Sequence, residues 1–263
     1  MPAIETKSCL APDKVTIVYS AAGRGEPGLV FIHGGLADRS FWKASLEHFA
    51  KSHRVAALDL PGHGESGIGR RKWGIPEFGA DVKAVVRAER LDKVVLIGNS
   101  LGGPVAIEAA LLLPGKAVMV IGVDTFHSLD YAATPEHARQ RAEAFRCDFA
   151  GSVHEMTRTL FQPDADPEIM ADAERRMARN SPNAAYAMFL SLGGYKVADA
   201  ARKLDIPLRA ICGDLYPVDF PGVRKVKPDF EAIIMSHMGH YPMLERPDEF
   251  NKHLETLLHS LPK

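Results

Sequence analysis

A serine between two glycines, set between a short apolar run and a helical pattern, constrains this chain more than any other feature. Residues 98–102 read Gly-Asn-Ser-Leu-Gly, and residues 92–97 before them predict a short buried strand. Residues 103–113 predict a helix that tolerates Pro104 in its first turn. A strand-to-helix turn this tight requires neighbours without side chains, and it lifts the serine hydroxyl clear of the sheet edge. The alternative interpretation is a flexible glycine-rich loop.

Further apolar runs predict more strands, and helical patterns separate most of them. One such helix covers residues 77–90, where Phe78, Val82, Val85 and Val86 form a single apolar stripe. Strands that alternate with helices indicate an α/β fold with a mostly parallel central sheet and right-handed crossovers. The other predicted strands cover residues 15–20, 29–33, 54–60, 117–123, 207–212 and 230–235.

The alternation stops between residues 126 and 196, where helical signals follow one another. Three pairs, Thr134-Pro135, Asp166-Pro167 and Ser181-Pro182, each resemble an N-cap followed by proline at the first helical position. Residues 152–155 read as a capping box. We therefore expect residues 1–125 and 197–263 to form an α/β core and residues 126–196 to form a helical cap, or lid, over the strand ends. The alternative is an independent helical domain without contact to the site.

Composition excludes several classes of protein. The chain has 263 residues, of which 46% are hydrophobic and 25% charged, as in an ordinary globular protein. A formal net charge of -1 gives no field that would attract nucleic acid or an anionic membrane. Three distant cysteines indicate neither a disulfide framework nor a zinc site, and His-Glu-x-x-His spacing is absent, so we expect no metal and no cofactor. The start lacks a signal peptide pattern and no apolar run approaches the roughly 20 residues of a membrane span, so a cytoplasmic location is expected.

Three more stretches accompany the serine turn. His33-Gly34-Gly35 ends one predicted strand, Asp-Leu-Pro-Gly-His-Gly-Glu-Ser at residues 59–66 ends the next, and Gly-His-Tyr-Pro-Met-Leu-Glu at residues 239–245 follows the last. With these motifs the chain resembles the α/β-hydrolase superfamily, in its capped, esterase-like branch, over nearly its full length. The resemblance implies an α/β-hydrolase fold with a nucleophile elbow, a catalytic triad and an oxyanion hole.

The resemblance implies that Ser100 is the nucleophile and His240 its general base. A serine hydroxyl is a poor nucleophile at neutral pH, so a base must accept its proton during attack. Among the 11 histidines, His240 has the glycine before it and the Tyr-Pro-Met-Leu-Glu run after it, which the nearby His237 lacks. The alternative is a histidine that only packs beneath the terminal helix.

The oxyanion of a tetrahedral intermediate needs hydrogen-bond donors, and the motifs suggest two. We expect the backbone N–H of Leu101, the residue after the nucleophile, and the backbone N–H of Gly35. The His-Gly-Gly stretch can also serve simply as a turn that requires glycine. His63, in the Pro-Gly-His-Gly turn, is interpreted as a structural residue.

The acid of the triad departs from the commonest family pattern. That pattern places it three residues beyond a glycine after the strand at 208–212, where this chain has Tyr216. Asp214 and Asp219 follow nearby, and Asp124 ends the preceding strand, where ligands gather in open α/β sheets. We predict that Asp124 orients His240, with Asp214 as the main alternative and Asp219 as a third.

Serine at the elbow argues against dehalogenases and epoxide hydrolases, which resemble this fold but carry aspartate there, and against dienelactone hydrolases, which carry cysteine. The predicted function is hydrolysis of a small to medium, mainly apolar ester or lactone, with a small-molecule substrate and neither nucleic acid nor a membrane as a partner. Thioester hydrolysis, acyl transfer, perhydrolysis and carbon–carbon hydrolysis of a diketone remain open, as does a non-catalytic ligand-binding receptor. An apolar pocket above Ser100 is expected from Phe126, Phe145, Phe149, Phe161, Met188 and Phe189.

Overall fold

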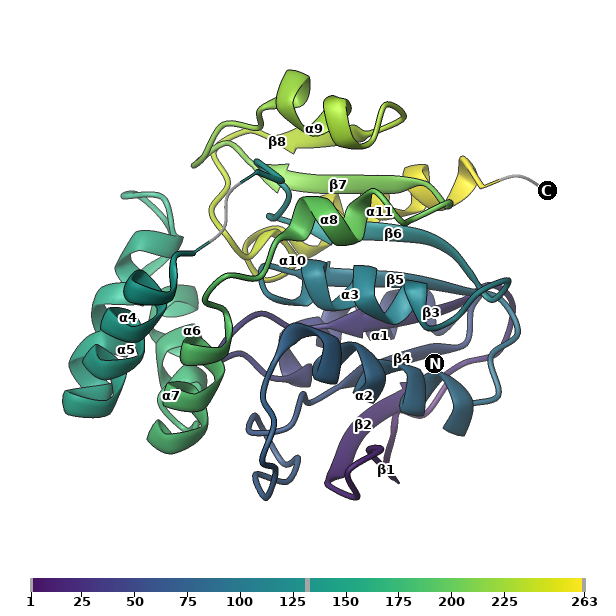
Figure 1. Ribbon diagram of the computed structural model, residues 1–263. Helices are drawn as coiled ribbons and strands as arrows, with labels where there is room; N and C mark the ends of the chain where they lie inside the picture. Colours follow the sequence, from purple (N-terminus) through teal and green to yellow (C-terminus); the bar gives the residue numbers. More distant parts are fainter. Residues whose placement is uncertain (1, 131–132, 262–263) are drawn as a thin grey trace.

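An eight-stranded sheet in the order β1-β2-β4-β3-β5-β6-β7-β8 forms the centre of the protein in a computed structural model that describes residues 2–130 and 133–261 (Figure 1). β2 pairs antiparallel with β1 and with β4, and all other neighbours pair in parallel. The mostly parallel α/β architecture predicted from the sequence is therefore confirmed. The strands are β1 (Glu5–Leu10), β2 (Thr16–Ala22), β3 (Gly28–Ile32), β4 (Val55–Leu58), β5 (Val94–Asn99), β6 (Ala117–Val123), β7 (Leu208–Gly213) and β8 (Glu231–Met235).

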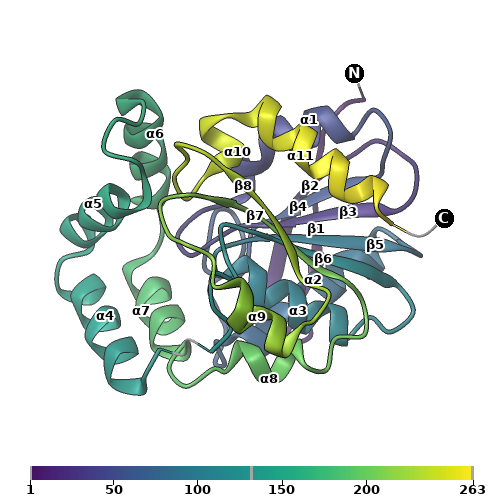
Figure 2. The ribbon, with the colours of Figure 1, turned by 90° about the horizontal axis from the view of Figure 1, so that it is seen from above.

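Helices cover both faces of this sheet, which is why the central strands β3, β4 and β5 are buried along their whole length. Figure 2 shows α1 (Lys43–Phe49), α10 (Pro242–Glu245) and α11 (Pro247–His259) on one face. The other face carries α2 (Ile75–Ala88), α3 (Gly102–Leu111), α8 (Val197–Ala201) and α9 (Phe220–Val226). A short 3₁₀ helix, η1 (Arg39–Trp42), precedes α1.

Four helices between β6 and α8 stand at one end of the sheet (Figure 1), and we call them the helical insertion. They are α4 (Pro135–Cys147), α5 (Phe149–Leu160), α6 (Pro167–Met177) and α7 (Pro182–Ser191). The three predicted N-caps are confirmed, because the side chains of Thr134, Asp166 and Ser181 each accept a backbone N–H of the first turn. Residues 131 and 132 of the predicted cap range lie outside the described residues.

Two features differ from the sequence predictions. The prediction of a capping box at residues 152–155 was wrong. Helix α5 begins one turn earlier, and Asp148 caps it by accepting the N–H of Gly151 at 2.9 Å. The edge strand β1 was not predicted, because its residues are polar or exposed and give no apolar run. Pairing with β2 defines this strand, whose sequence carries little signal of its own.

The parallel strands deliver the motif residues to one edge of the sheet. His33 follows β3, Asp59 follows β4, Ser100 follows β5 and Asp124 follows β6, while His240 lies on the loop after β8. Since parallel strands end at the same edge, residues far apart in sequence meet there.

Candidate active site

The turn at Ser100 has the backbone geometry that its glycines predict. Ser100 has a φ of 52°, in the left-handed region, and is half-buried between β5 and α3. A Cβ at Gly98 would lie 2.0 Å from the Gly102 carbonyl oxygen, and a Cβ at Gly102 would lie 2.4 Å from the Ile32 carbonyl oxygen. Neither position therefore accepts a side chain, which explains why glycine stands two residues before and two after the serine.

Asp124 and His240 form a short hydrogen bond beside this turn. Nδ1 of His240 lies 2.5 Å from Oδ2 of Asp124, and the Asp124 side chain is fully buried. The other oxygen, Oδ1, accepts the backbone N–H of Gly213 at 3.0 Å. The carboxylate is thus held from two sides, with one oxygen fixed on the imidazole ring.

The environment of Asp124 favours its ionised form. Burial by itself would raise the pKa of this carboxyl, but the neighbouring His127 and His240 hold it well below its usual range. A carboxylate that is charged at neutral pH can orient an imidazole and stabilise the imidazolium that forms when the ring accepts a proton.

Asn99 links the serine turn to both of these segments. Its buried side-chain amide donates to the carbonyl oxygens of Val123 and His240, each at 3.0 Å. The backbone N–H of Ser100 donates to the same Val123 carbonyl at 3.0 Å. This role of Asn99 was not predicted from the sequence, although a polar residue at the end of an apolar strand is a signal for it.

The loop of His33, Gly34 and Gly35 packs directly on the serine turn. A Cβ added to Gly34 would lie 2.8 Å from Oδ1 of Asn99 and 3.1 Å from the Cβ of Ser100. His33 fixes this loop, with Nδ1 2.7 Å from the Gly34 carbonyl and Nε2 accepting the N–H of Leu60 at 2.9 Å. Burial lowers the pKa of His33 to about 4, so the ring is neutral at pH 7. Gly35 and Leu101, the two expected oxyanion donors, thus belong to segments in direct contact.

Among the described residues, the structure brings Asp124 to His240 and places the other two candidate acids elsewhere. Asp214 is exposed and accepts the backbone N–H groups of His237 at 3.0 Å and Met238 at 3.1 Å. Asp219 caps α9 by accepting from the N–H of Gly222 at 3.0 Å. Asp214 therefore shapes the loop before His240, and Asp219 begins a helix.

The helical insertion contacts the site at several points. The carbonyl of Leu160 accepts the backbone N–H of His240 at 2.7 Å, and the side chain of Asn180 donates to the Leu36 carbonyl at 2.5 Å. On α7, the terminal methyl of Met188 lies 3.3 Å from where a Cβ of Gly35 would stand. The segments around Leu160, Asn180 and Met188 are thus in direct contact with the loops that carry His240, Leu36 and Gly35.

Most of the aromatic residues expected to line a pocket instead hold the helical insertion together. Phe145 stacks on Phe189 at 4.5 Å between ring centroids and meets Phe149 edge-on at 6.1 Å. Phe161 packs on Tyr241 at 5.6 Å, next to His240. Met188, rather than a phenylalanine, contacts the loop that follows His33.

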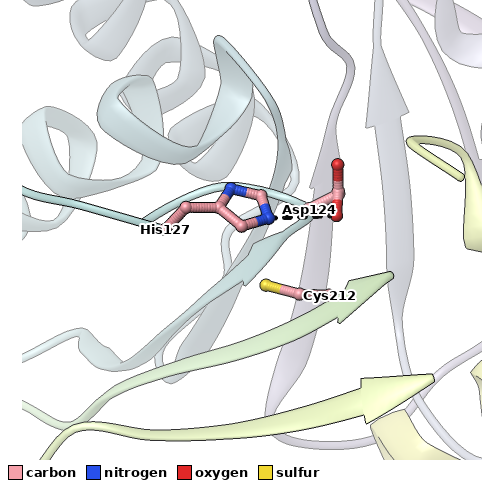
Figure 3. A group of neighbouring side chains, drawn as sticks. All are labelled: Asp124, His127 and Cys212. Atoms are coloured by element: carbon pink, nitrogen blue, oxygen red, sulfur yellow. Dashed lines mark ion pairs between the residues drawn. The ribbon is translucent and has the colours of Figure 1, made fainter. Parts of the chain in front are cut away.

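Two further side chains surround Asp124. Nε2 of His127 lies 3.3 Å from Oδ1 of Asp124, and Sγ of Cys212 on β7 completes a group whose ligand atoms all lie within 4.8 Å of one another (Figure 3). Burial, with a smaller contribution from the charge of Asp124, raises the pKa of the Cys212 thiol, so it is protonated at neutral pH. This group was not predicted from the sequence, because Cys212 follows His127 by 85 positions and Asp124 by 88.

Comparison with known proteins identifies the family. The family model described as alpha/beta hydrolase family matches residues 29–253, which is most of the chain. This protein belongs to the alpha/beta hydrolase family. Among the described residues of this alpha/beta hydrolase, no helix is both long and apolar enough to cross a membrane.

Relatives of this alpha/beta hydrolase include named esterases and lactonases. A pimeloyl-[acyl-carrier protein] methyl ester esterase of Aliivibrio fischeri is 26% identical over 92% of this chain and 97% of its own. A 3-oxoadipate enol-lactonase of Acinetobacter baylyi is 23% identical over 98% of both chains. The solved structure of a thermophilic esterase from Thermogutta terrifontis matches with a TM-score of 0.86, at 22% identity, over 97% of this chain and 98% of its own, which demonstrates a shared fold.

Proposed function

We propose that this protein is a serine hydrolase that cleaves a small to medium, mainly apolar ester or lactone through an acyl-Ser100 intermediate. The observation that carries the proposal is the 2.5 Å hydrogen bond between Asp124 and His240 beside the Ser100 turn. A serine on a nucleophile elbow, a histidine and a buried carboxylate are the parts that acyl transfer requires. The named activities of the relatives, an esterase and an enol-lactonase, support the same class of reaction.

In the first half-reaction, Nε2 of His240 accepts the proton of the Ser100 hydroxyl as the oxygen attacks the substrate carbonyl carbon. Asp124 stabilises the resulting imidazolium through Nδ1. The backbone N–H groups of Leu101 and Gly35 donate to the developing oxyanion. The tetrahedral intermediate then breaks its bond to the leaving oxygen, which takes the proton from His240 and leaves the acyl group on Ser100.

In the second half-reaction, His240 accepts a proton from water, whose oxygen attacks the acyl carbonyl. The second intermediate releases a carboxylic acid and returns the proton to Ser100. With a lactone, the leaving oxygen stays attached to the acyl chain, so the product is one hydroxy acid.

The helical insertion supports a substrate with apolar character. We assign residues 126–196 as a cap, because Leu160, Asn180 and Met188 contact the loops that carry His240 and Gly35. Met188 places a flexible apolar side chain next to Gly35, which has no side chain of its own. The partner is a small molecule, and the balanced charge supports neither nucleic acid nor an anionic membrane as a target. Three free cysteines support a reducing compartment such as the cytoplasm, which cell fractionation would test.

Covalent labelling tests the proposal. A fluorophosphonate probe should add one adduct to the wild type, measured by intact mass, and none to Ser100→Ala. A folded wild type that gains no adduct would overturn the proposal and favour the ligand-binding receptor.

A matched pair of variants tests the acid. Asp124→Asn should lower kcat on an aryl ester by about 10⁴-fold, because the imidazole loses its anionic partner. Asp214→Asn should leave kcat within a few-fold, since the Asp214 carboxylate accepts from the backbone N–H groups of His237 and Met238 and from the side chain of Gln162, and not from the His240 ring. The reverse order of effects would transfer the role to Asp214.

A further inference from the structure

Two side chains with metal-binding chemistry, His127 and Cys212, lie beside the Asp124 carboxylate on the side that His240 does not use. Oδ2 of Asp124 holds His240, whereas Oδ1 faces Nε2 of His127 at 3.3 Å, with Sγ of Cys212 close to both. Figure 3 shows the His127 ring directed at the carboxylate and Cys212 on the adjacent strand. Neither His127 nor Cys212 forms a bond to substrate or transfers a proton in the proposed hydrolytic reaction.

The nitrogen of His127 is unsatisfied in this arrangement. Nε2 is buried and makes no hydrogen bond of acceptable geometry, although it lies near a carboxylate oxygen. The Cys212 thiol has only a weak contact, 3.6 Å from the Thr125 carbonyl. A buried polar atom without a partner costs free energy, and a cation bound among these three atoms would satisfy the nitrogen.

The spacing of the three atoms fits a small tetrahedral cation. Zinc bonds to N, O and S ligands measure about 2.0–2.3 Å, which places the ligand atoms roughly 3.3–3.8 Å apart. The nitrogen and oxygen are already 3.3 Å apart, and all three atoms lie within 4.8 Å. Closing the cluster around a cation therefore requires atomic shifts of about 1 Å.

We propose that Asp124, His127 and Cys212 form an inhibitory binding site for a thiophilic divalent cation, of which Zn²⁺ is the representative. An imidazole nitrogen and a thiolate sulfur select zinc and its surrogate cadmium over magnesium or calcium, which prefer oxygen ligands. Water completes the fourth position. As the metal–sulfur bond forms, the S–H bond of Cys212 breaks and its proton passes to solvent, with no change of oxidation state.

The fold holds two of the ligands rigidly and leaves a route for the third. The N–H of Asp124 donates to the Ile211 carbonyl at 2.8 Å, which fixes the end of β6 against β7 just before Cys212. The side chain of His127 is 22% exposed, so a cation from solvent reaches the cluster through it. Rigid backbone pairing and one accessible ligand suit a site that fills and empties reversibly.

Occupancy would inhibit hydrolysis, a consequence that rests on the proposed function. A cation on Oδ1 neutralises the carboxylate, so Asp124 no longer stabilises a positive charge on His240. The reaction would lose the same interaction that Asp124→Asn removes, without any change at Ser100.

The first experiment measures metal binding directly, so its result does not depend on catalytic activity. Cd²⁺ titrated into both the wild type and Ser100→Ala should give a thiolate-to-cadmium absorption band that saturates at one ion per chain. Cys212→Ala should abolish the band, whereas Cys147→Ala, which removes an exposed thiol, should retain it. Absence of the band in the wild type, or its survival in folded Cys212→Ala, would overturn the site.

Inhibition is measured second, as hydrolysis of an aryl ester against Zn²⁺ concentration. The wild type should lose most of its activity and recover it with a chelator. His127→Ala and Cys212→Ala, each compared with its own activity without metal, should need at least about 10- to 100-fold more Zn²⁺, the loss that even an outer-shell partner causes. His127 is partly exposed, so its variant tests the site if Cys212→Ala unfolds.

The outcomes separate the two proposals. Equal sensitivity of the wild type and both variants to Zn²⁺ would overturn the inhibitory site while leaving the hydrolase intact. A wild type that binds Cd²⁺ through Cys212 but hydrolyses no ester would overturn the proposed function and support the metal site.

Discussion

Single polar and glycine residues set the geometry of the site. The Asn99 amide holds the Val123 and His240 carbonyls, and Gly34 lets a loop approach Ser100. Neither residue donates or accepts a proton in the proposed reaction. Both act by fixing where the reacting groups stand, which is the contribution that a rigid fold makes to catalysis.

Asn99→Ala should lower kcat on an aryl ester by about 10- to 100-fold, because the His240 backbone loses the amide that holds it near Ser100. KM should change little, since Asn99 is buried beneath the turn. Asn251→Ala removes a comparably buried amide that bonds Ser45, and it serves as the control for lost stability. Equal losses of activity in both variants would show that Asn99 acts only through folding.

Gly34→Ala should abolish most of the activity, since its Cβ would meet Oδ1 of Asn99 at 2.8 Å and Cβ of Ser100 at 3.1 Å. Gly69→Ala adds the same methyl group where nothing lies within 4 Å, and it should behave as the wild type. Steady-state kinetics of the two variants are compared directly. Full activity in Gly34→Ala would mean that the loop moves freely away from the serine turn.

The sequence predicted the helices and strands whose formation depends on neighbouring residues in the chain. Apolar runs identified the buried strands, and proline after a capping residue identified the starts of α4, α6 and α7. It did not predict β1, which depends on a neighbouring strand, or the Asp148 cap of α5. The choice among Asp124, Asp214 and Asp219 also stayed open, because only the folded chain determines which carboxylate meets His240.

Asn180 tests how the helical insertion is held against the core. Its amide donates to the carbonyls of Leu36, in the loop after β3, and Met177, at the end of α6. Asn180→Ala should destabilise the protein by about 1–3 kcal/mol and raise KM more than it lowers kcat, because the insertion loses its hold on the core. Asp166→Ala, which removes an exposed cap of α6, should cost about 1 kcal/mol and leave KM unchanged. Urea unfolding and steady-state kinetics provide both quantities, and an unchanged KM in Asn180→Ala would contradict the expectation.

For the whole molecule, buried titratable groups couple folding to pH. His33 and His63 are both buried, with ring centroids 4.9 Å apart. Burial lowers the pKa of His33 to about 4 and that of His63 to about 3. An unfolded chain binds protons at these histidines near pH 6.5, whereas the folded chain does not, so acid favours unfolding.

Stability should therefore fall as the pH drops below about 6.5, with His63 alone contributing a loss of about 2 kcal/mol at pH 5. Burial raises the pKa of Asp81 to about 6, so its protonation stabilises the folded state as the pH falls. This contribution is the same in the wild type and in a His63 variant. His63→Gln should thus lose less stability than the wild type between pH 7 and pH 5, measured by urea unfolding at each pH. Parallel losses in the two proteins would show that His63 is not held neutral.

The separation of Ser100 and His240 by 140 positions has a consequence for how the protein is made. During translation the serine turn emerges from the ribosome well before the loop that follows β8, and that loop alone carries the base. Under the proposed function, a chain synthesised only as far as α3 holds Ser100 without His240, so esters in its surroundings would not acylate the serine. Under the proposed function, reactivity begins only after the loop that carries His240 has been synthesised.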